Sequence, residues 1–429
     1  MDNTDKTSEN TPVNNAGESF YEQPLVQVER IPVTDGVKIG IQRVTNPLVG
    51  IGGAYGTWGE HIDNAGLPSM LESVLGEKLE DGEQLNLTEL GFQHRQFTPV
   101  MSEAENIELE VQVGKRFLVE AADACGWKPA EVDAVLVGIS GPVSDDYVER
   151  ICQEAGIPDS AIKVSVHKAC DGSVASLNLA LNPTLRVQQQ IGQNLAKVLN
   201  GKKVLVGGIE GLSRLLRTAH DKNAVQIFGN GAGIIGLVPG KSMKFLVGKA
   251  HEVYDEAGLL AFHMFYPHSK AYVEGESMIE VTQPKQNFIR VAGLMHEPTR
   301  GNSVEMAGMV GMVKLFVRNG AQVVEDVYQS YKQKMAELGM PGKEIAVAIV
   351  HHANFKINQL LEKTLNRDGI HFDMPWLLNE FGNVSAASNM IAFLRKLSSL
   401  KPGDHILFDG YGAGTYYDVL AVELGGRTE

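Results

Sequence analysis

Short runs of consecutive apolar residues alternate along this chain with segments of helical spacing. AVLVGIS at 134–140, IKVSV at 162–166 and EIAVAIV at 344–350 are typical of buried strands. Apolar residues spaced by four from Leu109 to Ala121, and by three and four from Val317 to Leu338, predict amphipathic helices. Strands that alternate with helices indicate an α/β protein whose sheets are covered by helices.

The same patterns place the remaining elements. The chain shows no compositional linker between its halves, so we expect one compact unit of two closely packed halves. A helix is expected to begin near Gly172, directly after the strand at 162–166. Further strands are expected at 37–44, 48–55, 203–210, 226–238, 405–408 and 416–424, and further helices at 146–156 and 357–365.

Composition excludes several classes of protein. The formal charge of −14 over 429 residues disfavours nucleic acid and anionic membranes as partners, because both attract basic surfaces. No apolar run approaches the roughly 20 residues of a membrane span. Residues 1–17 are polar and do not resemble a secretory signal, so a disordered tail is expected. Three widely spaced cysteines fit neither a disulfide framework nor a zinc site, and a reducing cytoplasm is the expected location.

Cys170 stands at a strand-to-helix junction. The strand at 162–166 would deliver it to the N-terminus of the helix that begins near Gly172, where unpaired N–H groups and the helix dipole favour a thiolate. A thiolate is the nucleophilic form of cysteine. The alternative is that Cys170 fills a small buried space, as free cysteines often do. Cys125 and Cys152 lie within predicted helices and are interpreted as packing residues.

A cysteine nucleophile needs a polar partner, and histidines are the candidates. His351 and His352 directly follow the strand at 344–350, and strand ends present catalytic groups in α/β folds. Adjacent residues on an extended backbone point in opposite directions, so one of the two at most faces a given site. Alternatively, both simply close the strand. His167 is the second candidate, and no histidine spacing supports a metal site, so no metal is expected.

Two glycine-containing segments near the C-terminus complete the candidate site. Asn383 follows Gly382 and would either cap a helix or hold its amide in a site. The glycines from Gly410 to Gly414 would expose backbone N–H groups suited to an oxyanion hole, or form an ordinary hairpin. GNGAGIIG at 229–236 lacks the dinucleotide-binding spacing, and Pro239 prevents the helix which that motif requires.

Cys170, His351, Asn383 and the glycine-rich segment, in this order, make the chain resemble the thiolase superfamily, and most closely its β-ketoacyl-ACP synthase III branch. The resemblance covers about residues 48–425. That branch carries A-C-x-G, P-H-Q-A-N-x-R-I, G-N-T-S-A-A-S and F-G-x-G motifs. They stand here as ACDG (169–172), VHHANFKI (350–357), GNVSAAS (382–388) and YGAG (411–414), and FGNGAG (228–233) and MAG (306–308) also match.

The resemblance implies an architecture. The fold would be a five-layered αβαβα sandwich of two pseudo-symmetric halves, normally a homodimer. The expected divisions are a tail at 1–17, an extension at 18–47, an N-terminal half at 48–245 with the cysteine, and a C-terminal half at 246–429 with the histidine and asparagine.

The resemblance also implies a chemistry. Cys170 would take an acyl group from an acyl thioester of coenzyme A or acyl carrier protein. His351 and Asn383 would then stabilise the enolate left when a malonyl-type thioester loses carbon dioxide. The backbone N–H groups of Cys170 and Ala413 would meet the oxyanion, and no cofactor beyond the thioester substrates is expected. Asn354, Lys356 and Gly308 match substrate-contacting positions of the family.

Several departures from the family concern the acyl donor. Glu89 stands where an arginine is usual, and Lys356 replaces the arginine of the histidine motif. His167 and Lys168 replace small residues before Cys170, and a cation there is expected to favour the thiolate. The alternatives are another acyl transfer, a synthase joining two acyl chains, or a non-catalytic ketosynthase-like subunit. Retention of all three site residues favours an enzyme.

Overall fold

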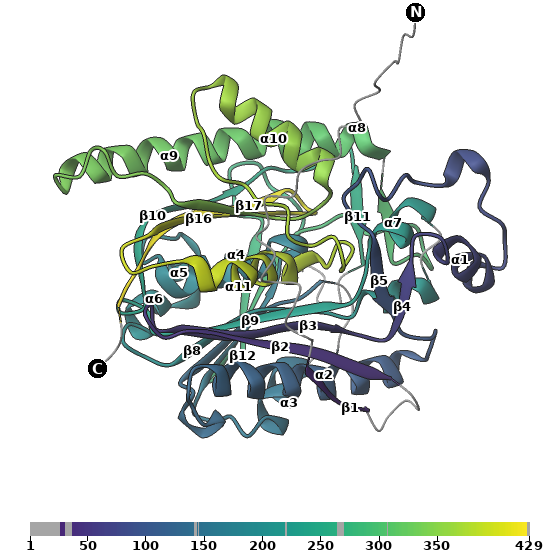
Figure 1. Cartoon of the computed structure of the whole chain (residues 1–429), viewed down its shortest axis with the longest axis horizontal. Coiled ribbons are helices and arrows are strands. Elements are labelled where there is room, and N and C mark those ends of the chain that lie inside the picture. The colour runs from purple at the N-terminus through teal and green to yellow at the C-terminus, as the bar shows by residue number, and fades with distance from the viewer. Residues whose placement is uncertain are drawn as a thin grey trace, which may run out of the picture.

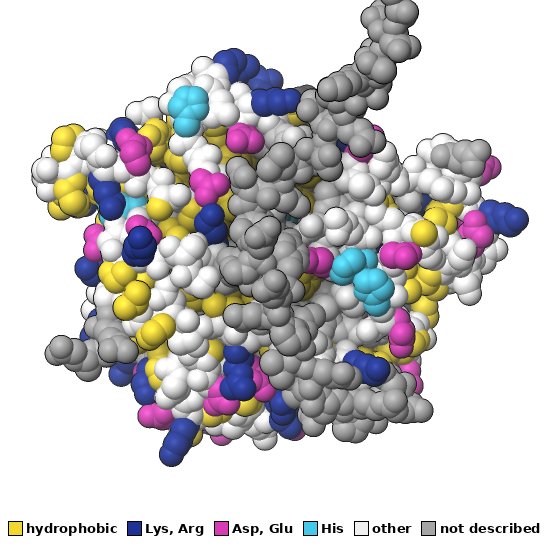
Figure 2. Space-filling view, in the orientation of Figure 1, with side chains coloured by type: hydrophobic (Ala, Val, Ile, Leu, Met, Phe, Trp, Pro, Cys, Tyr) yellow, Lys and Arg dark blue, Asp and Glu magenta, His cyan; other side chains and the backbone are white. Residues whose placement is uncertain are grey.

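The computed structural model describes residues 26–30, 37–140, 144, 146–218, 221–263, 270–306 and 308–426. The predicted tail at 1–17 lies outside the described residues, as does much of the predicted extension at 18–47. Two large β-sheets run through the molecule, with helices between them and on their outer faces (Figure 1). Among the described residues on the face shown in Figure 2, basic and acidic side chains are interspersed.

The first sheet has nine strands. Its centre is parallel: β6 pairs with both β7 and β8. These central strands read as unbroken apolar runs because both faces of the sheet are covered. In sheet order the strands are β1 (Val26–Arg30), β2 (Lys38–Asn46), β3 (Ile51–Trp58), β9 (Gly231–Leu237), β8 (Val204–Glu210), β6 (Ala134–Gly138), β7 (Ile162–His167), β13 (Phe288–Gly293) and β12 (Ile279–Lys285).

The second sheet has four strands. Its order is β10 (Met243–Glu252), β17 (Tyr416–Leu424), β16 (His405–Gly412) and β15 (Val347–Val350), and β15 runs parallel to β16. Two small antiparallel pairs lie apart from the large sheets. They are β4 (Glu60–Asp63) with β5 (His94–Phe97), and β11 (Leu260–Phe262) with β14 (Val304–Met306).

Helices form the other three layers. Helices α4 (Gly172–Leu181) and α11 (Ser388–Lys396) lie between the two large sheets (Figure 1). Helices α2 (Glu103–Ala124) and α3 (Tyr147–Glu154) cover the outer face of the first sheet, and α9 (Gly320–Glu337) and α10 (Phe355–Arg367) that of the second. The predicted α/β sandwich of five layers is confirmed. The remaining helices are α1 (Leu67–Leu75), α5 (Val187–Ile191), α6 (Leu195–Val198), α7 (Lys222–Ile227) and α8 (Gly308–Met312).

The position of each helix explains its sequence. All ten residues of α4 are buried, because sheets cover it on both sides. Helix α2 instead has one buried face, and Ser102 and Glu105 form a capping box at its start. Among the described residues, no helix is long and apolar enough to cross a membrane.

Two expectations about elements need correction. Residues 226–238 do not form one strand: α7 extends to Ile227, and β9 begins only at Gly231. Asp221 starts that helix by accepting hydrogen bonds from the next N–H groups. The long helix predicted from Val317 becomes α-helical at Gly320, after a π-helical turn over Val313–Asn319.

The C-terminal half contributes to the first sheet. The hairpin of β12 and β13 adds to this sheet through β7, with β13 parallel to β7, and sequence patterning did not predict it. The predicted boundary at residue 245 falls within β10 and stays a prediction.

Candidate functional site

Cys170 lies in a sharp turn between β7 and α4. Ala169–Asp171 form a single 3₁₀ turn, and α4 begins at Gly172, as the sequence predicted. The φ of Ala169 is 47°, in the left-handed region that non-glycine residues avoid. This strained conformation brings a half-buried Cys170 to the helix N-terminus. Cys125 and Cys152 belong to the packing around α2 and α3, also as predicted.

Two opposing effects act on the Cys170 thiol. Burial raises the pKa of Cys170 to about 12, and the Glu210 and Asp171 carboxylates add to this rise. The Ser385 hydroxyl, 3.2 Å from Sγ, lowers the pKa through a hydrogen bond. The N-terminus of α4 favours the thiolate, but a thiol with this pKa stays protonated at neutral pH. It therefore needs a group that accepts its proton before it can react as a thiolate.

His351 follows β15, and its ring is buried. Its Nδ1 lies 2.6 Å from the Ser388 hydroxyl, and the Tyr411 ring packs edge-to-face at 5.0 Å. Burial, with a smaller contribution from His352, lowers the pKa of His351 to about 3, so the imidazole is neutral at physiological pH. The Ser388 hydroxyl also lies 2.9 Å from the Ser385 carbonyl. Because that hydroxyl donates its one hydrogen to the carbonyl, it accepts from Nδ1, and the hydrogen of the neutral ring stands on Nδ1. If Ser388 turns its hydrogen to Nδ1 instead, the ring hydrogen stands on Nε2.

The other two histidines are engaged elsewhere. His352 donates from Nδ1 to the Val350 carbonyl at 2.8 Å and accepts from the Leu377 N–H at 3.0 Å. His167 lies 2.5 Å from the Ser165 hydroxyl through Nε2. Of the three, only His351 lines a cavity together with Cys170.

Asn383 holds its side-chain amide in place but does not cap α11, which begins five residues later at Ser388. Its Oδ1 accepts a hydrogen bond from the Ser385 N–H at 2.8 Å, and its Nδ2 donates to the Ala353 carbonyl at 3.2 Å. Helix capping, the alternative for this residue, is therefore wrong for α11. Both ends of the amide are oriented by backbone groups.

The glycine-rich segment approaches Cys170 closely. It is a hairpin between β16 and β17, and it also packs its backbone on the Cys170 turn. A Cβ at Gly412 would stand 2.7 Å from the Lys168 carbonyl oxygen and 3.0 Å from the Cys170 nitrogen. Only glycine allows this approach. Ala413, the next residue, lines the same cavity as Cys170.

Cys170, His351, Asn383 and Ala413 converge on one narrow cavity of about 50 Å³. A second cavity of about 80 Å³ adjoins it, because both are lined by Ile227, Met306, Met312 and Asn354, and Gly308 lines the second. Two of the three predicted substrate-contacting residues, Asn354 and Gly308, thus line these two adjoining cavities. The other walls of the first cavity are almost entirely apolar: Phe228, Leu260, Phe262, Val304, Phe316 and Ile357 among them.

The third predicted contact, Lys356, lies elsewhere. It lines neither cavity and forms an ion pair with Glu89 near the surface. Both residues depart from the family pattern, and their opposite charges pair with each other.

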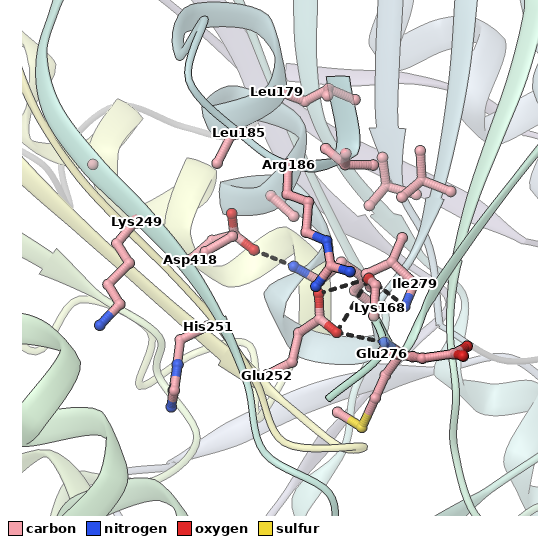
Figure 3. Close-up of a pocket in the computed structure, with 18 of the residues that line it drawn as sticks. Lys168, Leu179, Leu185, Arg186, Lys249, His251, Glu252, Glu276, Ile279 and Asp418 are labelled. Carbon is pink, nitrogen blue, oxygen red and sulfur yellow. Dashed lines mark hydrogen bonds and ion pairs between the residues drawn. The ribbon is translucent and has the colours of Figure 1, made fainter. Parts of the chain in front are cut away.

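Lys168 faces away from the nucleophile. It lies at the inner wall of a separate cavity of about 490 Å³, where it pairs with Asp418 (Figure 3). Its Nζ is also 2.7 Å from the carboxylate of Asp171. The expectation that Lys168 favours a Cys170 thiolate is therefore wrong, because two carboxylates neutralise the ammonium group. Burial and the charge of Asp418 raise the pKa of Asp171.

Sequence reasoning missed four polar residues around the site: Ser140, Glu210, Ser385 and Ser388. The two later serines lie inside the GNVSAAS motif, at two and five residues after Asn383, so the motif itself carried their signal. Ser140 and Glu210 follow or end buried strands, and only the fold brings them to Cys170. Among the described residues, no group of three or more His, Cys, Asp or Glu could hold a metal ion.

Known proteins resemble this chain in sequence. Residues 335–424 match the family model for the C-terminal part of 3-oxoacyl-[acyl-carrier-protein] synthase III. The chain is 23% identical over 384 residues to β-ketoacyl-[acyl-carrier-protein] synthase III 1 of Halalkalibacterium halodurans, covering 88% of this chain and 98% of that protein. It is 26% identical over 308 residues to the synthase III of Clostridium tetani, covering 70% and 80%.

Solved structures share the fold. The synthase III of Thermus thermophilus matches with a TM-score of 0.59 at 17% identity, covering 95% of this chain and 100% of that one. A fungal type III polyketide synthase matches with a TM-score of 0.58 at 13% identity, covering 91% and 100%. The chain therefore shares the fold of these condensing enzymes, and its residues 335–424 resemble the C-terminal part of 3-oxoacyl-[acyl-carrier-protein] synthase III.

Proposed function

We propose that this protein is an acyltransferase that forms an acyl-Cys170 intermediate and condenses it with a malonyl-type thioester by decarboxylation. The observation that carries the proposal is the convergence of Cys170, His351 and Asn383 on one enclosed, almost wholly apolar cavity. The relatives named as ketosynthases and polyketide synthases support a condensing acyltransferase as the kind of enzyme. The homodimer and the cytoplasmic location stay predictions.

The first step is acyl transfer. The Cys170 sulfur attacks the carbonyl carbon of an acyl thioester of coenzyme A or acyl carrier protein, and the donor thiolate leaves. The negative charge that develops on the carbonyl oxygen would be met by the backbone N–H groups of Cys170 and Ala413. Rigid backbone donors suit this role because they need no reorganisation as charge develops.

The second step is decarboxylation. When Ser388 turns its hydroxyl hydrogen from the Ser385 carbonyl to Nδ1, the neutral His351 carries its hydrogen on Nε2. Together with the Asn383 amide it would then donate hydrogen bonds to the thioester oxygen of the malonyl group and stabilise the enolate. Burial supports this role because it keeps the imidazole neutral. The apolar walls favour loss of a carboxylate as uncharged carbon dioxide. The enolate carbon then attacks the acyl-Cys170 carbonyl, and the sulfur leaves.

Intact-mass spectrometry tests the first step. Wild-type protein mixed with a panel of acyl-coenzyme A and acyl-carrier-protein thioesters should gain the mass of one acyl group. Cys170→Ala should gain none, whereas Cys125→Ala, at the other half-buried cysteine, should react like wild type. Absence of an adduct with every thioester would refute the enzyme and favour a non-catalytic subunit.

The second step has its own test. His351→Ala and Asn383→Ala should still acylate Cys170, but carbon dioxide release from a malonyl thioester should fall by about 100-fold or more, the usual effect of losing an oxyanion donor. Radiolabelled carbon dioxide and intact mass measure the two steps separately. Normal condensation by Asn383→Ala would contradict the assigned role of that amide.

A further inference from the structure

A chain of hydrogen bonds leads from Cys170 away from the substrate cavity. The Ser385 hydroxyl lies 3.2 Å from the Cys170 sulfur and 2.6 Å from the Ser140 hydroxyl. Ser140 and Glu210 meet at Arg214, whose Nη2 donates to the Ser140 carbonyl and lies 3.3 Å from a Glu210 oxygen. Hydrogen bonding by the Ser140 hydroxyl and backbone N–H lowers the pKa of the Glu210 carboxyl, which places Ser140 next to it. Two serine hydroxyls thus connect the proposed nucleophile to a buried carboxyl group.

The backbone holds the central serine of this chain in a strained conformation. Ser385 has a φ of 45°, in the left-handed region. Such a conformation costs free energy and persists only where the surrounding structure imposes it. Here the Asn383 amide accepts a hydrogen bond from the Ser385 N–H, and the Ser385 hydroxyl is thereby placed between Cys170 and Ser140.

Glu210 is buried among groups that allow it to hold a proton. It is fully inaccessible to solvent at the end of β8, and it accepts from the Ala386 N–H at 3.2 Å. Arg214 lies 3.3 Å from one of its oxygens and also binds both oxygens of Glu110 at 2.8 Å. Two buried carboxylates therefore face one guanidinium group. With both ionised the cluster would carry one excess negative charge, which is costly in a buried site.

The surroundings of Glu210 place its titration near neutrality. Burial raises the pKa of Glu210 to about 7, and Arg214 and the hydrogen bonds oppose this rise. The other titratable groups that interact with Glu210, Glu110 or Arg214 are the Tyr147 hydroxyl from α3, the His167 ring at the end of β7 and the Cys170 thiol. Burial lowers the pKa of His167 to about 3, so its ring stays neutral. Burial raises the pKa of Tyr147 well above its ordinary value, so that hydroxyl stays neutral.

We propose that Glu210 takes the thiol proton of Cys170 through the hydroxyls of Ser385 and Ser140, and returns it when the acyl group leaves the sulfur. Each hydroxyl can reverse its direction, because it carries one hydrogen and two acceptor lone pairs. In the thiol state Cys170 donates to Ser385, Ser385 to Ser140, and Ser140 to the Glu210 carboxylate. After transfer all three hydrogen bonds point the other way.

The step balances. The S–H bond of Cys170 and two O–H bonds break, two new serine O–H bonds form, and Glu210 becomes a neutral carboxylic acid. The sulfur keeps its electron pair and forms the S–C bond to an electrophile, whose leaving group departs with its own pair. When condensation later expels Cys170 as a thiolate, the same path returns the proton. No outside oxidant, reductant or buried water is required.

The high pKa of Cys170 explains why transfer of its proton to Glu210 would be needed. At a thiol pKa of about 12, about one molecule in 10⁵ would be a thiolate at pH 7. A proton acceptor that acts as the sulfur attacks makes a free thiolate unnecessary. The neutral His351 lines the same cavity and is assigned to the malonyl group.

Alkylation of Cys170 by iodoacetamide tests the relay without any acyl donor. The alkylation rate, followed by mass mapping of the Cys170 peptide from pH 5.5 to 9, should rise for wild type with an inflection near pH 7, where Glu210 ionises. Ser140→Ala and Glu210→Gln should lose this inflection and react at least about tenfold more slowly at pH 8. Ser140→Thr, which keeps a hydroxyl, should restore both.

The chain offers a matched control. Glu110→Gln removes a carboxylate from the same Arg214 but does not lie on the hydrogen-bonded path, so it should keep an inflection. Equal slowing at all pH values in Ser140→Ala, or an unchanged profile in folded Ser140→Ala, would overturn the relay even if Glu210→Gln fails to fold. The inference rests on the proposed nucleophile alone. A relay in alkylation without any thioester adduct would refute the proposed function but not the relay.

Discussion

At the scale of single residues, backbone strain marks the site. In the described part of the chain, three non-glycine residues have a left-handed backbone: Ala169, Ser385 and Thr415. Ala169 precedes Cys170, Ser385 follows Asn383 by two residues, and Thr415 follows Ala413 by two. Strained residues cluster at functional sites because the surrounding fold can impose a conformation that the residue itself disfavours. Here each strained residue belongs to a turn that brings one group to the cavity.

A second feature at this scale is the buried His352, where the family usually has glutamine. Its two ring nitrogens are both satisfied in the neutral form, one as donor and one as acceptor. Burial lowers the pKa of His352 to about 4. The unfolded chain, with a histidine pKa of about 6.5, therefore binds this proton first as the pH falls. Stability from the neutral ring is complete above pH 6.5 and is lost as the pH falls toward 4.

We predict that His352→Gln makes the protein less sensitive to acid. A glutamine amide can donate to Val350 and accept from Leu377 without titrating. The difference in the free energy of unfolding, variant minus wild type, should therefore increase by roughly 3 kcal/mol when the pH is lowered from 7 to 4. Urea unfolding at both pH values measures the difference. An equal difference at the two pH values would show that His352 is not kept neutral by the fold.

At the scale of elements, β16 approaches the Cys170 turn closely, backbone against backbone. Gly412→Ala would place a Cβ within 3.0 Å of three backbone atoms, which have no freedom to move aside. We predict a loss of about 1–3 kcal/mol in stability and a larger relative loss in Cys170 acylation, since the turn itself must shift. Gly342→Ala, where a Cβ meets nothing within 4 Å, is the control. Normal acylation by Gly412→Ala would contradict a rigid contact here.

The elements also show how far sequence reasoning reaches. Buried strands such as β6, β7 and β15 and the faces of α2 and α10 were predicted, because a local pattern determines them. The β12–β13 hairpin was not, since it is partly exposed, and its place beside β7 is a long-range contact. The order of motifs predicted that Cys170, His351 and Asn383 belong together. Glu210 could not be found that way, because its link to Cys170 runs through two serines distant in sequence.

At the scale of the whole molecule, one buried ion pair joins the Cys170 turn to the second sheet. Lys168, next to the turn, pairs with Asp418 on β17, and Asn178 of α4 donates to the same carboxylate at 2.6 Å. The pair therefore connects the first sheet, the middle helix layer and the second sheet. Its charges are balanced only in part, because Asp171 is a second buried carboxyl at the same ammonium group.

We predict that Lys168→Met destabilises the whole protein by about 3–5 kcal/mol, because it leaves two buried carboxyl groups without a cation. Burial and Asp418 already raise the pKa of Asp171, and Lys168 opposes this rise. Without Lys168 the folded pKa of Asp171 rises further above the unfolded value of about 3.9, so the folded state holds a proton that the unfolded chain releases. The loss should consequently be larger at pH 8 than at pH 5. Urea unfolding at both pH values measures it.

The control for this prediction is Lys332→Met, which breaks the surface pair with Glu344 and should cost no more than about 1 kcal/mol. Adding Asp418→Asn to Lys168→Met should recover part of the loss, because one of the two buried charges is then removed. The unfolding transition should stay single in every variant, since both large sheets also share one apolar core with the middle helices α4 and α11. Two separate transitions in Lys168→Met would show instead that the sheets unfold independently, and a loss equal at both pH values would show that the carboxyls do not carry the effect.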